Sequence, residues 1–166
     1  MGGLPNDILV RRLTNELQTL CDYLGADMEV SEEVFNEFPV EIRFTIENIP
    51  SYEKHGDWLE EINSHSFYLI IDKGYPFQKP RVRWDSPIFH PNIMSPDEGG
   101  HVCIKLLDSW DFNSSLVSFV RGVEHLISNP NPFNPFGTGS CIEAAEHYLS
   151  EDSEEASASE DSGARS

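Results

Sequence analysis

The first apolar pattern in the chain has the period of a helix. Its apolar positions recur every three or four residues and so share one helical face: Leu9, Leu13, Leu17, Leu20 and Leu24. Asn6 or Asp7 can cap the start of such a helix, and Gly25 can end it. The pattern predicts an amphipathic helix over residues 7–24.

The next segments have the period of strands. Apolar and polar residues alternate from 40 to 47, which is typical of a half-buried strand, and the denser apolar run 66–71 predicts a more central one. Residues 81–84 predict a short further strand, and residues 30–38 are a weaker candidate for an earlier one. The N-terminal helix is therefore expected to lead into a four-stranded antiparallel meander.

The C-terminal half returns to a helical period after a long irregular stretch. Residues 85–113 hold several prolines and glycines but no long periodic element, and a loop of that length in a compact domain is often functional. A second helix is expected to follow, with one apolar face: Leu116, Phe119, Val120, Val123, Leu126 and Ile127. The prolines of Asn129–Pro132 stop it. A short third helix is expected at about 139–150, which makes the fold class α+β.

The last residues, 151–166, differ in composition from the rest. They are acidic and rich in serine and have almost no apolar residues, so they cannot offset their ordering entropy and are predicted to form a disordered acidic tail after a single domain at 1–150. Such a tail is either a solvated end or a segment that attracts a basic surface on a partner protein.

Charge and cysteine content narrow the function classes. A formal net charge of -18 disfavours binding to nucleic acid or to an anionic membrane. The chain has three widely spaced cysteines and no CxxC pair, which indicates neither a disulfide framework nor a zinc site. With no apolar run of spanning length and no signal-peptide pattern at the start, we expect a monomeric cytoplasmic protein without a metal or cofactor.

Cys103 is the candidate nucleophile. A free cysteine taken alone is more often a small buried hydrophobe, and Cys21 and Cys141 are interpreted that way. Cys103, however, follows His90-Pro91-Asn92 and a Gly-Gly turn within the long loop. Thioester exchange needs a thiol that attacks as thiolate and also leaves well, together with a donor for the oxyanion, which an Asn side-chain amide can supply.

Two histidines leave a second chemistry open. His90 or His101 could act as a general base for Cys103, as in cysteine hydrolases. A histidine between Phe89 and Pro91 more plausibly fixes the loop through hydrogen bonds to the backbone.

The motifs together resemble a known family. They occur in the order found in ubiquitin-conjugating enzymes, over residues 6–150: Tyr75–Pro80 (YPFQKP), Phe89–Ile93 (FHPNI), Cys103, Trp110 and Asn129–Pro132 (NPNP). The resemblance implies the UBC fold, with Cys103 accepting a ubiquitin-like protein from an activating enzyme as a thioester. The modifier then passes to a lysine amine of a protein substrate, with or without a RING-type ligase.

The same resemblance implies roles for the other motif residues. Asn92 would stabilise the oxyanion or order the loop, and His90 and Pro91 would support the site. Asn134 falls where the family positions and desolvates the incoming lysine, and Phe77 resembles the apolar residue that docks on a RING-type ligase. The first helix would face the activating enzyme.

Several positions depart from the common pattern. The stretch from Asn92 to Cys103 carries extra residues, Lys105 replaces a common acidic residue, and Asn134 cannot act as a base. Trp110-Asp111-Phe112 replaces a small-residue loop. These differences suggest a divergent member, in a minimal prokaryotic ubiquitin-like pathway. The competing hypothesis on the same fold is a non-catalytic binding module.

Overall fold

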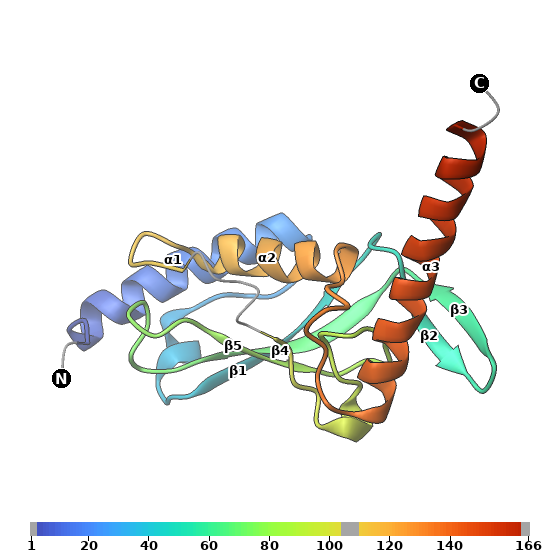
Figure 1. Cartoon of the computed structure of the whole chain (residues 1–166). Helices are drawn as coiled ribbons and strands as arrows, with labels where there is room; N and C mark the ends of the chain where they lie inside the picture. The colour runs from blue at the N-terminus through green and yellow to red at the C-terminus, as the bar shows by residue number, and fades with distance from the viewer. Residues whose placement is uncertain (1–2, 104–109, 164–166) are drawn as a thin grey trace.

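The computed structural model describes residues 3–103 and 110–163 of the 166-residue chain, with side chains up to Glu151. Two helices, α1 (Asn6–Leu24) and α2 (Leu116–Ser128), lie along one face of an antiparallel sheet, as Figure 1 shows. The α+β class with an N-terminal helix and C-terminal helices is confirmed. None of the described helices is long and apolar enough to cross a membrane.

The leucine face of α1 supplies one side of the core. Four of its five predicted leucines, Leu9 to Leu20, are fully buried against the sheet and α2, and Leu24 is half-buried. Gly25 ends the helix at a φ of 66°, a left-handed conformation that costs glycine little. The expected helix and its end are therefore confirmed.

The sheet has three strands in the order β1-β4-β5: β1 (Val40–Ile46), β4 (His65–Ile71) and β5 (Arg81–Trp84). All pairs are antiparallel, with Val40 opposite Ile71 and Phe67 opposite Trp84. In β4 every residue except Tyr68 is buried, which confirms that the dense apolar run forms the central strand.

The predicted meander has three strands in place of four: β1, β4 and β5 pair in the expected order, but residues 30–38 form no strand. The polar stretch after β1 forms a separate two-stranded sheet, β2 (Ser51–His55) with β3 (Trp58–Ile62), around a turn in which Gly56 has a φ of 60°. Most of its side chains are at least partly exposed, so the hairpin lacks the alternation by which half-buried strands are recognised.

The weaker strand candidate at 30–38 is also wrong. That segment contains a 3-10 turn, η1 (Glu32–Phe35), which buries Phe35 in the core. Two glutamates stand in its first turn, where backbone N–H groups favour negative charge.

The helix α2 matches its predicted apolar pattern, but the last helix is longer than predicted. Ser115 caps α2 by accepting from the backbone of Ser118, and the six predicted apolar residues of α2 are buried. The last helix, α3 (Gly139–Gly163), continues well past residue 150, through most of the segment expected to be disordered. Glu and Ala are good helix formers and can extend a helix that is already nucleated. The division of the chain at 150 stays a prediction.

Candidate active site

Cys103 and Asn92 lie side by side at the base of a loop. The backbone N–H of Cys103 donates to the Asn92 carbonyl at 3.0 Å, and Ile93 bridges Val102 next to it. The extra residues between them fold back on themselves, because the N–H of Met94 donates to the His101 carbonyl at 2.8 Å. The extension therefore leaves Asn92 and Cys103 as direct neighbours.

A short 3-10 turn, η2 (Pro96–Glu98), and two glycines form the tip of this loop. Gly100 has a φ of 66°, and a Cβ at this position would lie 2.7 Å from the Trp84 carbonyl oxygen. Trp84 in turn donates its N–H to the Gly100 carbonyl at 2.8 Å. The Gly-Gly turn thus lets the loop lie directly against β5.

His90 supports the site from within the core. It is buried, its Nε2 lies 2.9 Å from the Leu126 carbonyl oxygen, and its Nδ1 accepts from the Asn92 backbone N–H at 3.0 Å. Since Nδ1 accepts, Nε2 carries the proton and the ring is neutral. Burial lowers the pKa of His90 to about 4. Both ring nitrogens are committed to the backbone.

The positions of the two histidines do not fit the active site of a cysteine hydrolase. Among the described residues, the Cys103 sulfur makes no hydrogen bond to His90 or His101. His90 has no free nitrogen, and His101 is exposed. A general base needs a ring nitrogen within reach of the thiol, and neither histidine offers one here.

The Asn92 side chain is fully buried and holds the connection between α2 and α3. Its Oδ1 accepts from the Asn131 N–H at 2.7 Å, and its Nδ2 donates to the carbonyls of Asn131 at 3.0 Å and Asn134 at 3.2 Å. Both amide hydrogens are thereby used. This geometry favours ordering of the loop over donation to an oxyanion.

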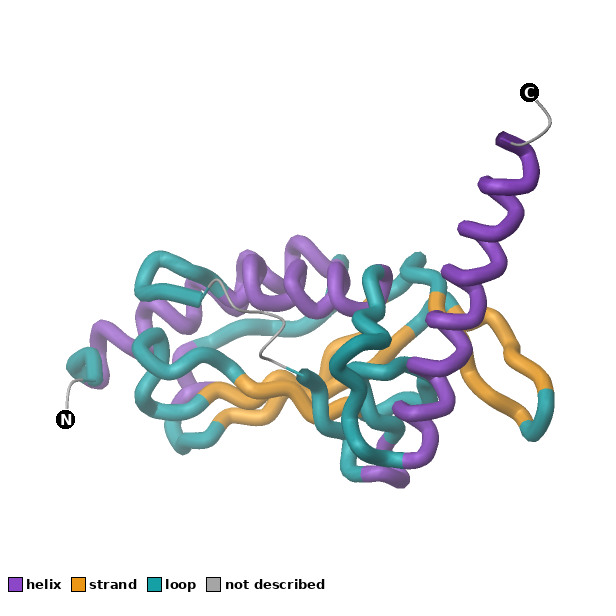
Figure 2. Tube along the Cα trace, viewed as in Figure 1, coloured by secondary structure: helices purple, strands orange, loops and turns teal. Residues whose placement is uncertain are grey.

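Further bonds fix the same connection over the motif. The N–H of Phe136 donates to the Pro91 carbonyl at 3.0 Å, and the Cys141 thiol lies 3.7 Å from the Ile93 carbonyl oxygen. Figure 2 shows these two stretches of loop side by side. The Asn134 side chain is exposed and makes no hydrogen bond to the part of the chain that is described.

The three cysteines differ in access. Cys21 and Cys141 are buried, as expected for small hydrophobes, and burial raises the pKa of both thiols. Cys103 is partly exposed. Of the three cysteines, it is the one with solvent-exposed surface. Lys105 lies outside the described residues.

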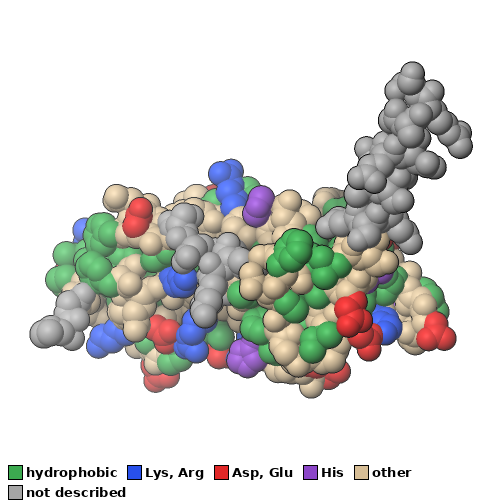
Figure 3. Space-filling view, in the orientation of Figure 1, with side chains coloured by type: hydrophobic (Ala, Val, Ile, Leu, Met, Phe, Trp, Pro, Cys, Tyr) green, Lys and Arg blue, Asp and Glu red, His purple; other side chains and the backbone are tan. Residues whose placement is uncertain are grey.

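Apolar side chains also gather beside this site. Figure 3 shows them on the surface formed by the α2–α3 connection and the first turns of α3, and the exposed ones include Phe133 and Ile142, at 77% and 42% exposure. Phe133 directly precedes Asn134, so a protein that approaches Asn134 meets an apolar surface. No sequence signal pointed to Phe133, because an isolated aromatic residue in a loop belongs to no periodic pattern.

A second surface contains Phe77. Its ring is 57% exposed and lies 5.4 Å, centre to centre, from the ring of Phe112, which is 47% exposed. We call these two rings the aromatic patch. The Arg12 guanidinium lies 4.9 Å from the centre of the Phe112 ring and donates to the Phe112 carbonyl at 2.7 Å.

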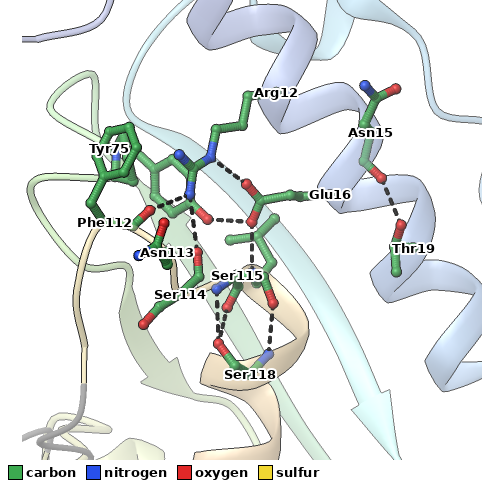
Figure 4. Close-up of polar contacts among 12 residues, drawn as sticks. Arg12, Asn15, Glu16, Thr19, Tyr75, Phe112, Asn113, Ser114, Ser115 and Ser118 are labelled. Atoms are coloured by element: carbon green, nitrogen blue, oxygen red, sulfur yellow. Dashed lines mark hydrogen bonds and ion pairs between the residues drawn. The ribbon is translucent and has the colours of Figure 1, made fainter.

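Figure 4 shows the polar network beneath the aromatic patch. The Glu16 carboxylate accepts from Arg12 Nε at 2.7 Å, from the Tyr75 hydroxyl, and from the Leu116 N–H at 2.9 Å. Burial, and then Glu16, raise the pKa of Tyr75. One carboxylate thus joins α1, the loop before β5 and the start of α2. The i,i+4 spacing of Arg12 and Glu16 was the available sequence signal.

One group of metal-type ligands occurs among the described residues, although the sequence predicted no metal. Ligand atoms of Glu53, His55 and Glu60 lie within 4.8 Å of one another on the β2–β3 hairpin. His55 Nε2 is 2.8 Å from a Glu60 carboxylate oxygen, so an ordinary exposed hydrogen bond accounts for the cluster. It includes none of the motif residues.

Comparison with known proteins identifies the family. The family model "Ubiquitin-conjugating enzyme" matches residues 58–160, more than half of the chain. The chain belongs to this family. The motif resemblance is confirmed, and the antiparallel sheet with flanking helices agrees with the family fold.

Individual relatives are distant. The chain is 33% identical to human ubiquitin-conjugating enzyme E2 T over 72 residues, which cover 40% of this chain and 35% of that protein. It is 29% identical over 73 residues to ubiquitin conjugating enzyme E2 B of Dictyostelium discoideum, covering 44% and 48% of the two chains. Against ubiquitin-conjugating enzyme E2 N of Macaca fascicularis it is 32% identical over 68 residues, covering 40% and 43%. The matches span half or less of these relatives, as expected for a divergent member.

Proposed function

We propose that the protein carries a ubiquitin-like modifier as a thioester on Cys103 and transfers it to a lysine amine. The observation that supports this most is the pairing of a partly exposed cysteine with a hydrogen-bonded HPN segment: the Cys103 N–H is bonded to the Asn92 carbonyl at 3.0 Å. The other two thiols of this family member are buried.

The proposed reaction has two acyl transfers. In the first, the Cys103 thiolate attacks the carbonyl carbon of the activating enzyme's thioester, a new C–S bond forms, and the activating enzyme's thiolate leaves. In the second, a lysine amine attacks the Cys103 thioester, a C–N bond forms, the C–S bond breaks, and Cys103 leaves as thiolate. Neither step needs a metal or an organic cofactor.

The neighbouring residues have distinct proposed roles. Asn92 orders the α2–α3 connection, residues 129–138, which we call the wall of the site. Its amide hydrogens bind the carbonyls of Asn131 and Asn134 there. Donation to an oxyanion would require it to release the bond to Asn134, which at 3.2 Å is the longer of the two. The exposed amide of Asn134 can hydrogen-bond the incoming amine but cannot take its proton, which therefore passes to water.

Partner surfaces follow from the same proposal. A RING-type ligase would dock on the aromatic patch, and the activating enzyme would contact the exposed side of α1, where Ile8 is 48% exposed. The free thiol requires a reducing compartment, which the cytoplasm supplies. The non-catalytic binding module remains the second candidate.

The decisive assay follows the adduct through both steps. The protein is incubated with an activating enzyme, ATP and a ubiquitin-like modifier, and is then chased with free lysine. We expect a thiol-sensitive adduct that disappears as modifier–lysine product appears. An adduct that yields only free modifier would indicate a hydrolase, and no adduct with any modifier would favour the binding module.

A further inference from the structure

Glu98, at the tip of the extra loop, contacts the start of α3. Its carboxylate accepts from the Thr138 hydroxyl at 3.3 Å and from the Ser140 N–H at 3.4 Å, and it also binds the Ser140 hydroxyl. Glu98 is half-buried. A carboxylate at a helix N-terminus satisfies free backbone N–H groups and favours the helix dipole.

The wall of the site is therefore held at both ends. Asn92 binds the backbone of Asn131 and Asn134 at one end, and Glu98 binds Thr138 and Ser140 at the other. The two holding residues lie at the base and the tip of the same loop. Asn134 lies at the end held by Asn92, four residues before Thr138, and its side chain is exposed.

We propose that Glu98 is a positioning residue for lysine transfer, a role that rests on the function proposed above. By fixing the start of α3, its carboxylate sets the position of the wall along which the amine approaches Cys103. Reaction rates respond steeply to such placement, since a shift of 1 Å can cost as much as about a hundredfold. A small thiol that attacks the same thioester needs no contact with this wall.

The loop offers its own matched control. Asp97 is adjacent to Glu98 and carries the same charge, but it is exposed and makes no hydrogen bond or ion pair with the described residues. Glu98→Ala and Asp97→Ala therefore remove equal charge from the same turn, and only the first removes the contacts to α3.

The test compares two acceptors in single turnover. Each variant is loaded with modifier, and discharge to free lysine is measured beside discharge to a small thiol. Glu98→Ala should lower the rate of discharge to lysine by about tenfold, which is less than the loss that a misplaced group can cause. The rates of thioester loading and of discharge to the small thiol should stay within about twofold of wild type. Asp97→Ala should stay within about twofold in all three. Equal lysine rates in the two variants, or an equal fall in all three steps for Glu98→Ala, would overturn the proposal.

Two further variants test whether Glu98 acts through its contact with the start of α3. Glu98→Gln retains an oxygen that can accept from Ser140, so its lysine rate should lie between those of Glu98→Ala and wild type. The double variant Glu98→Ala, Ser140→Ala should lose less than the sum of the two single losses, because the Ser140 hydroxyl is one of the partners of Glu98. Fully additive losses would contradict the proposed contact between Glu98 and the start of α3.

A readout without catalysis separates this inference from the proposed function. Hydrogen exchange at the Ser140 amide should rise in Glu98→Ala and stay unchanged in Asp97→Ala. If wild type forms no thioester, the proposed function fails, and this exchange experiment still decides whether Glu98 holds α3. Unchanged exchange in both variants would remove the basis of the inference.

Discussion

The wall of the site and the aromatic patch are built in opposite ways. At the wall, buried polar side chains bind loop backbone: Asn92 is fully buried and makes three hydrogen bonds to Asn131 and Asn134. At the patch, Phe77 and Phe112 are about half exposed and rest on a carboxylate network beneath them.

The two regions therefore suit different tasks: the wall holds a fixed geometry, and the patch can dock a partner. Loop backbone has few bonds of its own, so buried side-chain bonds are needed to give the wall one conformation. Exposed aromatic rings stabilise the free protein little but can bury much area against a partner. Substitutions in the wall should therefore lower the unfolding free energy of the isolated protein strongly, and substitutions in the patch should not.

The largest expected effect on stability is at Asn92. Asn92→Ala removes three hydrogen bonds to buried or partly buried backbone and should cost about 3 kcal/mol of unfolding free energy, at about 1 kcal/mol each. Urea unfolding measures this. Asn134→Ala is the control, because its side chain is exposed and unbonded, and it should cost less than about 0.5 kcal/mol. Equal losses of unfolding free energy in the two variants would mean that the buried hydrogen bonds of Asn92 do not stabilise the wall.

The next effect is a pH dependence at His90. Folding lowers the pKa of His90 from 6.5 to about 4, so below pH 6.5 the unfolded chain binds the proton more readily than the folded one. Stability from this group is full above pH 6.5 and falls as the pH drops toward 4. Between pH 7 and pH 5 the wild type should lose about 2 kcal/mol more than His90→Gln.

Urea titrations at several pH values test this prediction. Burial also lowers the pKa of His65, and both proteins in the comparison keep that residue. Parallel pH profiles for wild type and His90→Gln would mean that His90 is not held as a neutral ring between Leu126 and Asn92.

The smallest effect is expected at the patch. Phe77→Ala should cost less than about 1 kcal/mol of unfolding free energy because its ring is already more than half exposed. A double-mutant cycle with Phe112→Ala should give a coupling of about 0.5 kcal/mol for the ring pair. A loss as large as that of Asn92→Ala would show that the patch is part of the core.

Sequence reasoning succeeded where the signals were local or periodic. The leucine face of α1, the apolar run of β4 and the apolar face of α2 all lie where their periods place them. Each element buries one face, and that constraint is visible in the residues themselves.

Sequence reasoning failed where contacts between residues far apart in the chain decide the structure. The β2–β3 hairpin has mostly exposed faces and no alternation, and the partners of Asn92 and Glu98 lie about forty residues further along the chain. The HPN motif pointed to Asn92 but could not show that both of its amide hydrogens are bonded. No local feature of the sequence distinguished Glu98 from its acidic neighbour Asp97.

The central claim, that Cys103 carries the modifier, is tested most directly by removing cysteines selectively. After incubation with activating enzyme, ATP and modifier, intact-mass measurement should find one thiol-sensitive adduct on wild type. The double variant Cys21→Ala, Cys141→Ala should form it equally, and Cys103→Ala should form none. An adduct that persists in Cys103→Ala, or that disappears when only the two buried cysteines are replaced in a folded protein, would contradict the account.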